Sequence, residues 1–279
     1  MPRLAVLGHP VSHSRSPAMH AVALAELGLA GDWSYEAIEV APSDFEALVG
    51  SLPRRGFAGV NVTVPHKLAA LALADSASEA AGAIGAANTL SFTAAGVRAE
   101  NTDASGLLAA LPESPAGRRA LVLGAGGSAR ACAWALREAG ARVSIWNRTA
   151  ARAKRLAAEL DVVQAHPSAG GWRWEPDDFD LLVNATTVGL DEASAPGAGS
   201  PRTALKRVLI DADSLETRHI VVDLVYGDSP TPLTALARQR GAQVVDGLEV
   251  LVHQGAASLR IWTGMDPPVE AMRRAARAS

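Results

Sequence analysis

The first hundred residues carry short apolar runs that end at glycine, proline or polar residues. Residues 4–8 are apolar and end at Gly8, which is typical of a buried strand. Alternating or β-branched patterns predict further strands, and apolar positions at helical spacing predict helices between them. The predicted strands are residues 35–40, 59–64, 88–92 and 96–100, the last two paired around a turn, and the predicted helices are residues 16–28, 68–74 and 78–83, with another that opens at Ser43.

Two of these helices begin at typical capping residues. Ser16 precedes Pro17, so we expect Ser16 to cap the helix and Pro17 to be its first residue. Ser43 and Glu46 have the spacing of a capping box, in which two side chains satisfy free N–H groups at the helix start.

From about residue 103 onward, strands and helices alternate regularly. The predicted strands are residues 120–123, 142–146, 181–184, 220–225 and 244–245, and the predicted helices are residues 127–140, 150–160, 234–239 and 248–262. This alternation is typical of a parallel, doubly wound sheet. Residues 191–200 are rich in proline, glycine, alanine and serine, which predicts a surface loop.

The change of pattern predicts two α/β domains with a deep cleft between them. A chain of 279 residues is a natural length for two domains. We assign residues 1–103 to the first domain and complete it with residues 247–279, because the stretch after Gly264 is too short to fold alone. Residues 104–246 form the second, Rossmann-like domain, whose strand ends are expected to face the cleft.

The composition argues against several classes of protein. The formal net charge of −3 favours neither a nucleic-acid partner nor an anionic membrane surface. Cys132 is the single cysteine, so the chain forms no internal disulfide. The N-terminus enters a strand without a signal peptide, and no apolar run has the length of a membrane span. We therefore expect a cytoplasmic monomer or homodimer that acts on a small molecule.

A glycine-rich turn lies between a predicted strand and a predicted helix in the second domain. Its sequence is Gly124-Ala125-Gly126-Gly127-Ser128-Ala129. Glycines there permit a tight turn and let the backbone approach a pyrophosphate, which the free N–H groups of the helix start attract. The turn predicts a dinucleotide site, and the alternative is a strand-to-helix turn that binds nothing.

The end of the next strand indicates which dinucleotide binds. An NAD enzyme usually has an acidic residue there, whereas this strand ends in Asn147-Arg148-Thr149 and Arg152 follows. A guanidinium suits a 2′-phosphate, and two cations in a first helical turn are unfavourable without an anion nearby. We predict NADP rather than NAD, although both arginines could instead form a solvated helix start.

Polar side chains follow the strands of the first domain. Asn61 and Thr63 alternate on one strand, and Lys67 comes just past its end. Asn88 and Asp103 lie at the ends of other short strands. Only three of the 26 basic residues are lysines, so a lysine at such a place is noteworthy. A lysine placed by a carboxylate can exchange the hydroxyl proton when a ketone and an alcohol interconvert.

Taken in order along nearly the whole chain, these motifs resemble the shikimate dehydrogenase family. They are Gly8-His9-Pro10 with His13-Ser14-Arg15-Ser16-Pro17-Ala18-Met19-His20, Asn61-Val62-Thr63-Val64-Pro65-His66-Lys67, Gly85-Ala86-Ala87-Asn88-Thr89, Asn101-Thr102-Asp103, the glycine-rich turn, Asn147-Arg148-Thr149 with Arg152, Asn184-Ala185-Thr186, Tyr226, the run from Gly247 to Gln254, and Trp262-Thr263-Gly264. The resemblance implies reversible reduction of 3-dehydroshikimate to shikimate by NADPH, on the route to aromatic amino acids, and no metal.

The resemblance also implies roles for individual residues. Lys67 and Asp103 become the catalytic pair, and the two are expected to titrate together. The implied substrate residues are Ser14 and Ser16 for the carboxylate, Asn61, Thr63, Asn88 and Gln254 for the ring hydroxyls, and Tyr226 close by. The residues implied to border the nicotinamide are Thr186, Val225 and Gly247.

Each of these residues also has a purely structural interpretation. Ser16 and Asp103 could be helix caps, Asn88 could stabilise a turn, and Lys67 could be a solvated lysine. The chain also departs from the family's usual residues at two positions. The family's Tyr-x-Pro pattern reads Tyr226-Gly227-Asp228 here, with Asp228 in place of the proline, and Val250 stands where the family frequently has methionine.

Two other functions stay open. A quinate or dual quinate/shikimate dehydrogenase would share the reaction class and would in many cases use NAD, which Arg148 argues against. A non-catalytic NADP-binding sensor on the same fold would have no need of Lys67 and Asp103.

Overall fold

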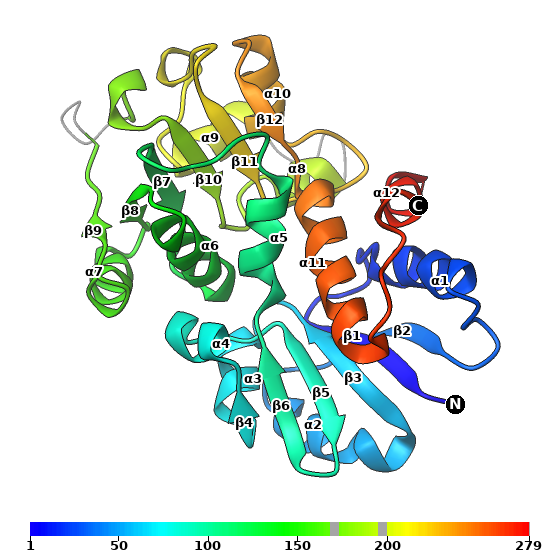
Figure 1. The fold of residues 1–279 in the computed structure, drawn as a ribbon. Helices are drawn as coiled ribbons and strands as arrows, with labels where there is room; N and C mark the ends of the chain where they lie inside the picture. Colours follow the sequence, from blue (N-terminus) through cyan, green and yellow to red (C-terminus); the bar gives the residue numbers. More distant parts are fainter. Residues whose placement is uncertain (168–172, 195–199, 279) are drawn as a thin grey trace. The chain divides into compact units, whose positions relative to one another are not determined.

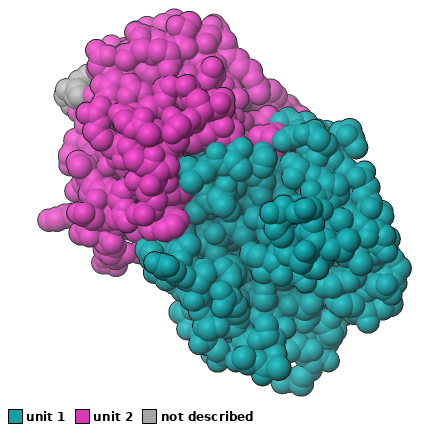
Figure 2. Space-filling model, viewed as in Figure 1, with its two compact units in different colours: residues 1–109, 251–279 teal, residues 110–250 magenta. Residues whose placement is uncertain are grey.

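The computed structural model describes residues 1–167, 173–194 and 200–278 (Figure 1). The chain forms two compact units (Figure 2): unit 1 is residues 1–109 with 251–279, and unit 2 is residues 110–250. The domain boundaries expected from the sequence, at 103/104 and 246/247, fall within α5 (Thr102–Ala110) and directly before α11 (Gly247–Thr263).

Unit 1 is built on a six-stranded mixed sheet with the order β2-β1-β3-β5-β6-β4. Its strands are β1 (Arg3–Gly8), β2 (Ser34–Glu39), β3 (Phe57–Val62), β4 (Ser76–Ala77), β5 (Thr89–Thr93) and β6 (Gly96–Glu100). β1 is parallel to β2 and β3, and β5 is antiparallel to both β3 and β6. The predicted pairing of residues 88–92 with 96–100 is confirmed, whereas β3 ends at Val62, two residues earlier than predicted.

Helices connect these strands, and two more come from the C-terminal part of the chain. They are α1 (Ser16–Glu26), α2 (Phe45–Ser51), α3 (Lys67–Ala72), α4 (Glu79–Ile84), α5, α11 and α12 (Val269–Ala278), with a 3-10 turn at Pro53–Arg55. Figure 1 shows α12 beside α1, which agrees with the contacts between these helices. The C-terminal helices therefore complete unit 1.

Both predicted helix caps are wrong. α1 starts at Ser16 itself, and the side chain that accepts a hydrogen bond at this end is Ser14, whose Oγ lies 3.3 Å from Ser16 N. α2 starts at Phe45, and Asp44 before it has helical angles (φ −105°, ψ −5°) and no capping bond. A side chain caps from an extended residue, and the chain is already turning at both places.

Unit 2 is built on a six-stranded sheet in which every neighbouring pair is parallel. Its order is β12-β11-β10-β7-β8-β9, with β7 (Arg119–Leu123), β8 (Arg142–Trp146), β9 (Val163–Gln164), β10 (Leu181–Asn184), β11 (Ile220–Asp223) and β12 (Gln243–Val245). The first strand lies in the middle, and later strands add on either side of it. This is the doubly wound order of a Rossmann-like sheet, and it confirms the predicted fold class.

The helices of unit 2 follow its strands. They are α6 (Gly127–Glu138), α7 (Ala150–Glu159), α8 (Leu190–Ser194), α9 (Pro201–Arg207) and α10 (Pro232–Gln239), with 3-10 turns at Pro176–Asp178 and Ala212–Ser214. The loop predicted for residues 191–200 is wrong in its first part, because α8 occupies Leu190–Ser194. Residues 195–199 of that predicted loop lie outside the described residues.

Each unit has its own apolar core. In unit 1, β1 and β3 contribute Leu7 and Val60, which pack with Phe45 and Leu90. In unit 2, Trp174 and Phe179 are buried with Leu182 and Val221. Within the described parts of the chain, no helix combines the length and apolar character needed to cross a membrane.

Candidate active site

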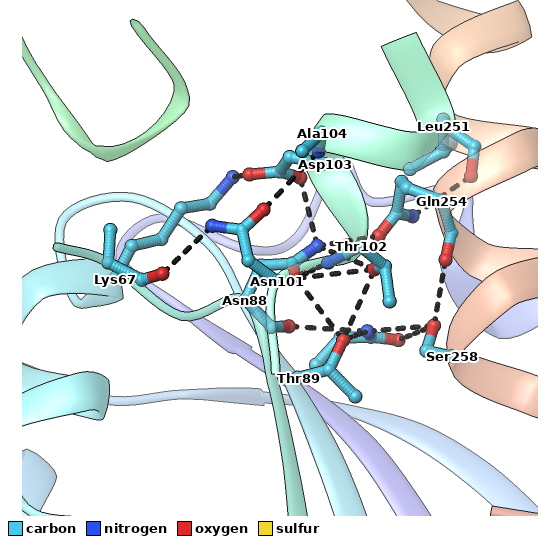
Figure 3. Close-up of polar contacts among 12 residues, drawn as sticks. Lys67, Asn88, Thr89, Asn101, Thr102, Asp103, Ala104, Leu251, Gln254 and Ser258 are labelled. Carbon is cyan, nitrogen blue, oxygen red and sulfur yellow. Dashed lines mark hydrogen bonds and ion pairs between the residues drawn. The ribbon is translucent and has the colours of Figure 1, made fainter. Parts of the chain in front are cut away.

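Lys67 and Asp103 form an ion pair at the starts of two helices of unit 1. Lys67 is the first residue of α3, and Asp103 lies in the first turn of α5. Lys67 Nζ donates to Asp103 Oδ2 at 2.6 Å (Figure 3), and the two side chains are only 10% and 13% exposed. The interpretation of Lys67 as a solvated lysine is therefore wrong. Each charge stabilises the other, since either one alone would be costly to bury away from water.

Asn88 holds the other side of this carboxylate. It directly precedes β5, and its Nδ2 donates to Asp103 Oδ1 at 2.9 Å. Its Oδ1 accepts from Thr102 N at 2.7 Å, which ties Asn88 to the start of α5. Both oxygens of Asp103 thus have a donor, so the carboxylate has one orientation toward Lys67.

Asn101, rather than Asp103, caps α5. Asn101 Oδ1 accepts from Ala104 N at 3.3 Å, and Asn101 Nδ2 donates to Ala86 O at 2.9 Å. Asp103 is one residue inside the helix, where a negative charge suits the positive end of the helix dipole. The capping role is therefore filled, and the side chain of Asp103 is directed at Lys67 and Asn88.

α11 supplies two further polar side chains, four residues apart and so on one face of the helix. Gln254 Oε1 lies 3.1 Å from Asn88 Nδ2 (Figure 3). Ser258 Oγ accepts from Asn61 Nδ2 at 3.0 Å. α5 can approach this face because Gly106 has no side chain. A Cβ on Gly106 would lie 2.7 Å from the Cβ of Gln254.

Asn61 is the centre of a second group of hydrogen bonds. Its Nδ2 lies 3.2 Å from Thr89 Oγ1, besides Ser258, and its Oδ1 accepts from Tyr35 OH at 2.8 Å. Thr89 Oγ1 is in turn 3.2 Å from Thr102 Oγ1. Asn61 is therefore joined to Asn88 and Asp103 by a continuous polar network.

The predicted carboxylate residues connect to this network through two rings. Ser14 is half-buried and Ser16 is 3% exposed, and the carbonyl of Ser16 accepts from His20 Nδ1 at 2.9 Å. The His20 ring stacks on Tyr35 with 4.0 Å between the centroids, and Tyr35 donates to Asn61. Burial lowers the pKa of His20 to about 4, so this ring stays neutral near pH 7.

Thr63 lies one residue past the end of β3, where it contacts Gly8 at the end of β1. A Cβ on Gly8 would lie 2.5 Å from Thr63 Cγ2, so the first predicted strand must end in glycine for the two chain segments to approach. Thr63 N donates to Leu7 O at 2.8 Å and continues the pairing of the sheet. The main chain thereby fixes the position of Thr63.

The glycine-rich turn of unit 2 is placed as the sequence predicted. Gly124 follows β7 and Gly126 precedes α6, whose first residue is Gly127. Gly124 has φ +119°, and a Cβ there would lie 2.9 Å from Ala185 O. Among the described residues, a Cβ on Gly126 would meet no atom within 4 Å. The turn is open on one side and closely packed on the other, which suits a ligand at the start of α6.

The arginines that follow β8 are exposed. Thr149 is the last residue before α7, Arg148 precedes it, and Arg152 lies in the first turn of that helix. Asn147 Nδ2 donates to Thr149 O at 3.1 Å and shapes the turn. Within residues 1–167, 173–194 and 200–278, neither guanidinium has an ion-pair partner. The two cations are available to an anion from outside the chain.

The remaining predicted cofactor residues lie at the ends of β10, β11 and β12. Thr186 Oγ1 donates to Asn184 Oδ1 at 2.7 Å, and Val225 N donates to Asp223 Oδ1 at 3.1 Å. Gly247 starts α11, and a Cβ there would lie 2.6 Å from Leu224 O. These residues follow the carboxyl ends of the strands, the edge where doubly wound sheets bind ligands.

Tyr226 lies in unit 2, three residues after the end of β11. Gly227, the residue that follows it, has a clear packing role. A Cβ on Gly227 would lie 2.6 Å from the carbonyl oxygen of Ala193 in α8, and Ser229 N donates to that same oxygen at 3.1 Å. Glycine at this position lets the loop after β11 lie against α8. Asp228 is exposed and Val250 is buried.

Several members of the cluster were not identified from the sequence as site residues. Thr89 and Thr102 adjoin residues that were, and Ser258 lies one helical turn after Gln254, so their positions gave a usable signal. Tyr35 gave none, because its contact with Asn61 depends on the pairing of β2 with β1 and of β1 with β3.

Known proteins are similar to this chain along almost its whole length. Residues 6–90 match the shikimate dehydrogenase substrate binding domain, residues 108–169 the shikimate/quinate 5-dehydrogenase family, and residues 247–277 the shikimate 5′-dehydrogenase C-terminal domain. A shikimate dehydrogenase (NADP(+)) from Thermus thermophilus is 47% identical, with 99% of this chain and 98% of the relative covered. One from Methanothermobacter thermautotrophicus is 41% identical, covering 97% and 94%.

The fold is also similar to that of solved structures. A crystal structure of shikimate 5-dehydrogenase from Thermus thermophilus, in complex with NADP(H) and shikimate, has a TM-score of 0.84 and 42% identity. The match covers 100% of this chain and 99% of that one.

Proposed function

This chain belongs to the shikimate dehydrogenase family, and from that membership we propose that it reversibly reduces 3-dehydroshikimate to shikimate with NADPH. The observation that carries the proposal is the buried pair of Lys67 Nζ and Asp103 Oδ2, 2.6 Å apart. A protein that only bound NADP would gain nothing from two charges buried in the unit that does not contain the glycine-rich turn.

The pair suits the proton transfer that this reaction requires. Reduction of a ketone adds a hydride to carbon and a proton to oxygen, and bound NADPH supplies the hydride. We propose that the proton moves to the substrate oxygen from the hydrogen bond between Lys67 Nζ and Asp103 Oδ2, and returns to it in the reverse direction. Asn88, by holding Asp103 Oδ1 at 2.9 Å, keeps the carboxylate facing Lys67 throughout.

The surrounding polar groups suit a polyhydroxylated acid. We propose that Asn61, Thr63, Asn88 and Gln254 bind the ring hydroxyls, and that Ser14 and Ser16, at the start of α1, bind the carboxylate. The network supports this assignment, because Asn61 Nδ2 donates to the main-chain carbonyl of Asn88, and Asn88 Nδ2 donates to Gln254 Oε1, which restricts the orientations of these amides. Preoriented donors and acceptors lose little entropy when they bind a rigid ring. We also propose that Tyr226 contacts the substrate.

The residues of unit 2 fit NADP. We propose that the backbone of Gly124, Ala125, Gly126, Gly127, Ser128 and Ala129 binds the pyrophosphate. Arg148 and Arg152, with Asn147 and Thr149, would hold the 2′-phosphate, and Thr186, Val225 and Gly247 would border the nicotinamide. The open space at Gly126 and the two exposed guanidinium groups support this assignment.

The proposed reaction needs only small-molecule partners, shikimate or 3-dehydroshikimate and NADP. We propose a cytoplasmic location, where a chain with one cysteine, Cys132, buried in α6, stays reduced.

The role of Lys67 is tested by replacing it with alanine. Loss of acid–base catalysis typically lowers turnover by about 10² to 10⁴-fold, so we expect kcat of Lys67→Ala to fall within that range. The affinity for shikimate, measured by calorimetric titration, should change by only a few fold. Lys154→Ala on α7 is the control and should keep wild-type kcat. A variant that loses shikimate affinity while its turnover stays intact would contradict the proposed role.

A further inference from the structure

We propose that Asp223, the last residue of β11, is a positioning residue for the nicotinamide end of the cofactor. It acts through the two loops that follow β10 and β11 in unit 2. The inference rests on the proposed function, because it assigns the residue a part in NADPH binding. No motif in the sequence drew attention to Asp223.

The side chain of Asp223 is completely buried and fully hydrogen-bonded. Its Oδ1 accepts from Asn184 Nδ2 at 2.8 Å and from Val225 N at 3.1 Å. Its Oδ2 accepts from Thr231 Oγ1 at 2.5 Å. One carboxylate therefore joins the end of the neighbouring strand, the backbone two residues onward and the start of α10.

Asn184 extends the same network into the loop after β10. Its Oδ1 accepts from both Thr186 N, at 3.1 Å, and Thr186 Oγ1, at 2.7 Å. Its Nδ2, besides donating to Asp223, lies 3.2 Å from Val188 O. The carboxylate of Asp223 fixes the amide of Asn184, and that amide fixes the loop that carries Thr186.

The network holds the residues that we assign to the nicotinamide end. Thr186 and Val225 are direct members of it. Gly247 packs against the same loop, since a Cβ there would lie 2.9 Å from Val225 O. Gly124, in the turn assigned to the pyrophosphate, packs against Ala185 O at the other loop. A displacement of either loop would therefore change the walls of the cofactor site.

The free energy needed to bury this carboxylate indicates that it serves function rather than folding. Its partners are an amide, a backbone N–H and a hydroxyl, none of which is charged. Burial raises the pKa of Asp223 from 3.8 to about 6, so the ionised carboxylate is less stable in the fold than in the unfolded chain. Groups buried at such a cost tend to occur where a site needs fixed geometry.

The test compares two ligands. NADPH carries the nicotinamide, whereas adenosine 2′,5′-bisphosphate carries the 2′-phosphate without it. We expect Asp223→Ala to raise the Kd of NADPH at least tenfold in calorimetric titration and to leave the Kd of the bisphosphate within twofold of wild type. Asp223→Asn keeps an oxygen for the Asn184 and Val225 donors, so it should bind NADPH within threefold of wild type.

Asp180→Asn is the matched control. Asp180 directly precedes β10, at the amino end of the strand, whereas the two loops follow the carboxyl ends of β10 and β11. Asp180 accepts from Arg119 N at 2.8 Å and from Arg119 Nε at 3.1 Å. This variant removes a structural carboxylate from the same sheet without touching the two loops. Both of its dissociation constants should match wild type.

The inference is overturned if folded Asp223→Ala binds NADPH as wild type does, or if the substitution lowers the affinity for NADPH and for the bisphosphate equally. Should Asp223→Ala not fold, Thr231→Val takes its place. We expect Thr231→Val to bind NADPH about threefold or more weakly and to bind the bisphosphate as wild type does. Thr231→Ser should restore the affinity for NADPH. Equal NADPH affinity in Thr231→Val and wild type would equally overturn it. Wild-type protein that binds no NADPH would refute the proposed function itself. Wild-type turnover together with an unaffected Asp223→Ala would refute this inference alone.

Discussion

At the scale of single residues, the polar groups of unit 1 are held by more than one neighbour. Asp103 accepts from Lys67 and Asn88, and Asn61 accepts from Tyr35 while donating toward Thr89. Each group therefore offers a substrate a defined donor or acceptor. Arg148 and Arg152 of unit 2 differ, since both are exposed and neither has an ion-pair partner among the described residues.

We propose that one of these arginines, Arg148, determines the choice of cofactor. A hydrogen bond to a charged group contributes about 1.5–3 kcal/mol, so Arg148→Ala should raise the KM for NADP+ by roughly tenfold or more. The KM for NAD+ should stay near its wild-type value, because NAD+ has no 2′-phosphate. Steady-state kinetics with both cofactors measures the change.

Arg142→Ala serves as the control for this experiment. Arg142 is the exposed first residue of β8, at the other end of the strand that leads to Arg148. Its loss should leave both KM values unchanged. An unaltered NADP+/NAD+ preference in Arg148→Ala would refute the assignment of the 2′-phosphate site.

Residues at strand ends could be predicted from the sequence, and their long-range partners could not. Lys67, Asn88 and Asp103 stand out because each lies at or just beyond the end of a predicted strand. Ser258 contacts Asn61 across 197 residues of chain, and a local pattern contains no information on such a contact. Asp223 was overlooked because its role depends on Asn184, a residue of the neighbouring strand.

At the scale of elements, most strands and helices follow from local periodicity, and the exceptions have physical causes. α8 was missed because residues 191–200 have a loop-like composition, whereas contacts with Gly227 and Ser229 hold Leu190–Ser194 in a helix. The capping box at Ser43 was wrong because α2 starts after a residue with helical angles. Packing determines the secondary structure of the short segments, whereas the sequence pattern is enough to predict the long ones.

The crossing of α5 and α11 gives a prediction at this scale. A methyl group at Gly106 would lie 2.8 Å from Gln254 N and 2.9 Å from Gln254 Cα, within the backbone of α11. Overpacking of this kind typically costs about 1–3 kcal/mol. Gly106→Ala should lower the free energy of unfolding by that amount in urea denaturation and raise the KM for shikimate, since Gln254 must move.

Gly50→Ala is the matched control for Gly106→Ala. Gly50 lies in α2, and a Cβ there would meet no described atom within 4 Å. Alanine is the better helix former, so this variant should be as stable as wild type or more stable. If both variants had wild-type stability and KM, the close approach of the two helices would be refuted.

At the scale of the whole molecule, Asp223 predicts how stability depends on pH. Its pKa is 3.8 in an unfolded chain and about 6 in the fold, so between these values the folded state binds more protons. The free energy of unfolding therefore falls as pH rises from about 4 to 6. Relative to wild type, Asp223→Asn should gain about 2 kcal/mol between pH 4 and pH 7, since asparagine does not titrate.

The comparison must be made between variant and wild type, because other groups titrate in the same window. Burial lowers the pKa of His20 to about 4, so its contribution is lost as pH falls from 6.5, in the opposite direction. His20 is present in both proteins and cancels in the difference. Urea denaturation across this pH range measures it, and a difference independent of pH would contradict the shifted pKa of Asp223.

The central claim is that this chain is an NADP-dependent dehydrogenase of shikimate, and one measurement tests it most directly. The purified protein is mixed with shikimate or quinate and with NADP+ or NAD+, and kcat/KM is obtained from nicotinamide absorbance for the four pairs. We expect the highest value for shikimate with NADP+, at least tenfold above either pair that contains NAD+. A preference for quinate, or no turnover with any pair, would contradict the claim.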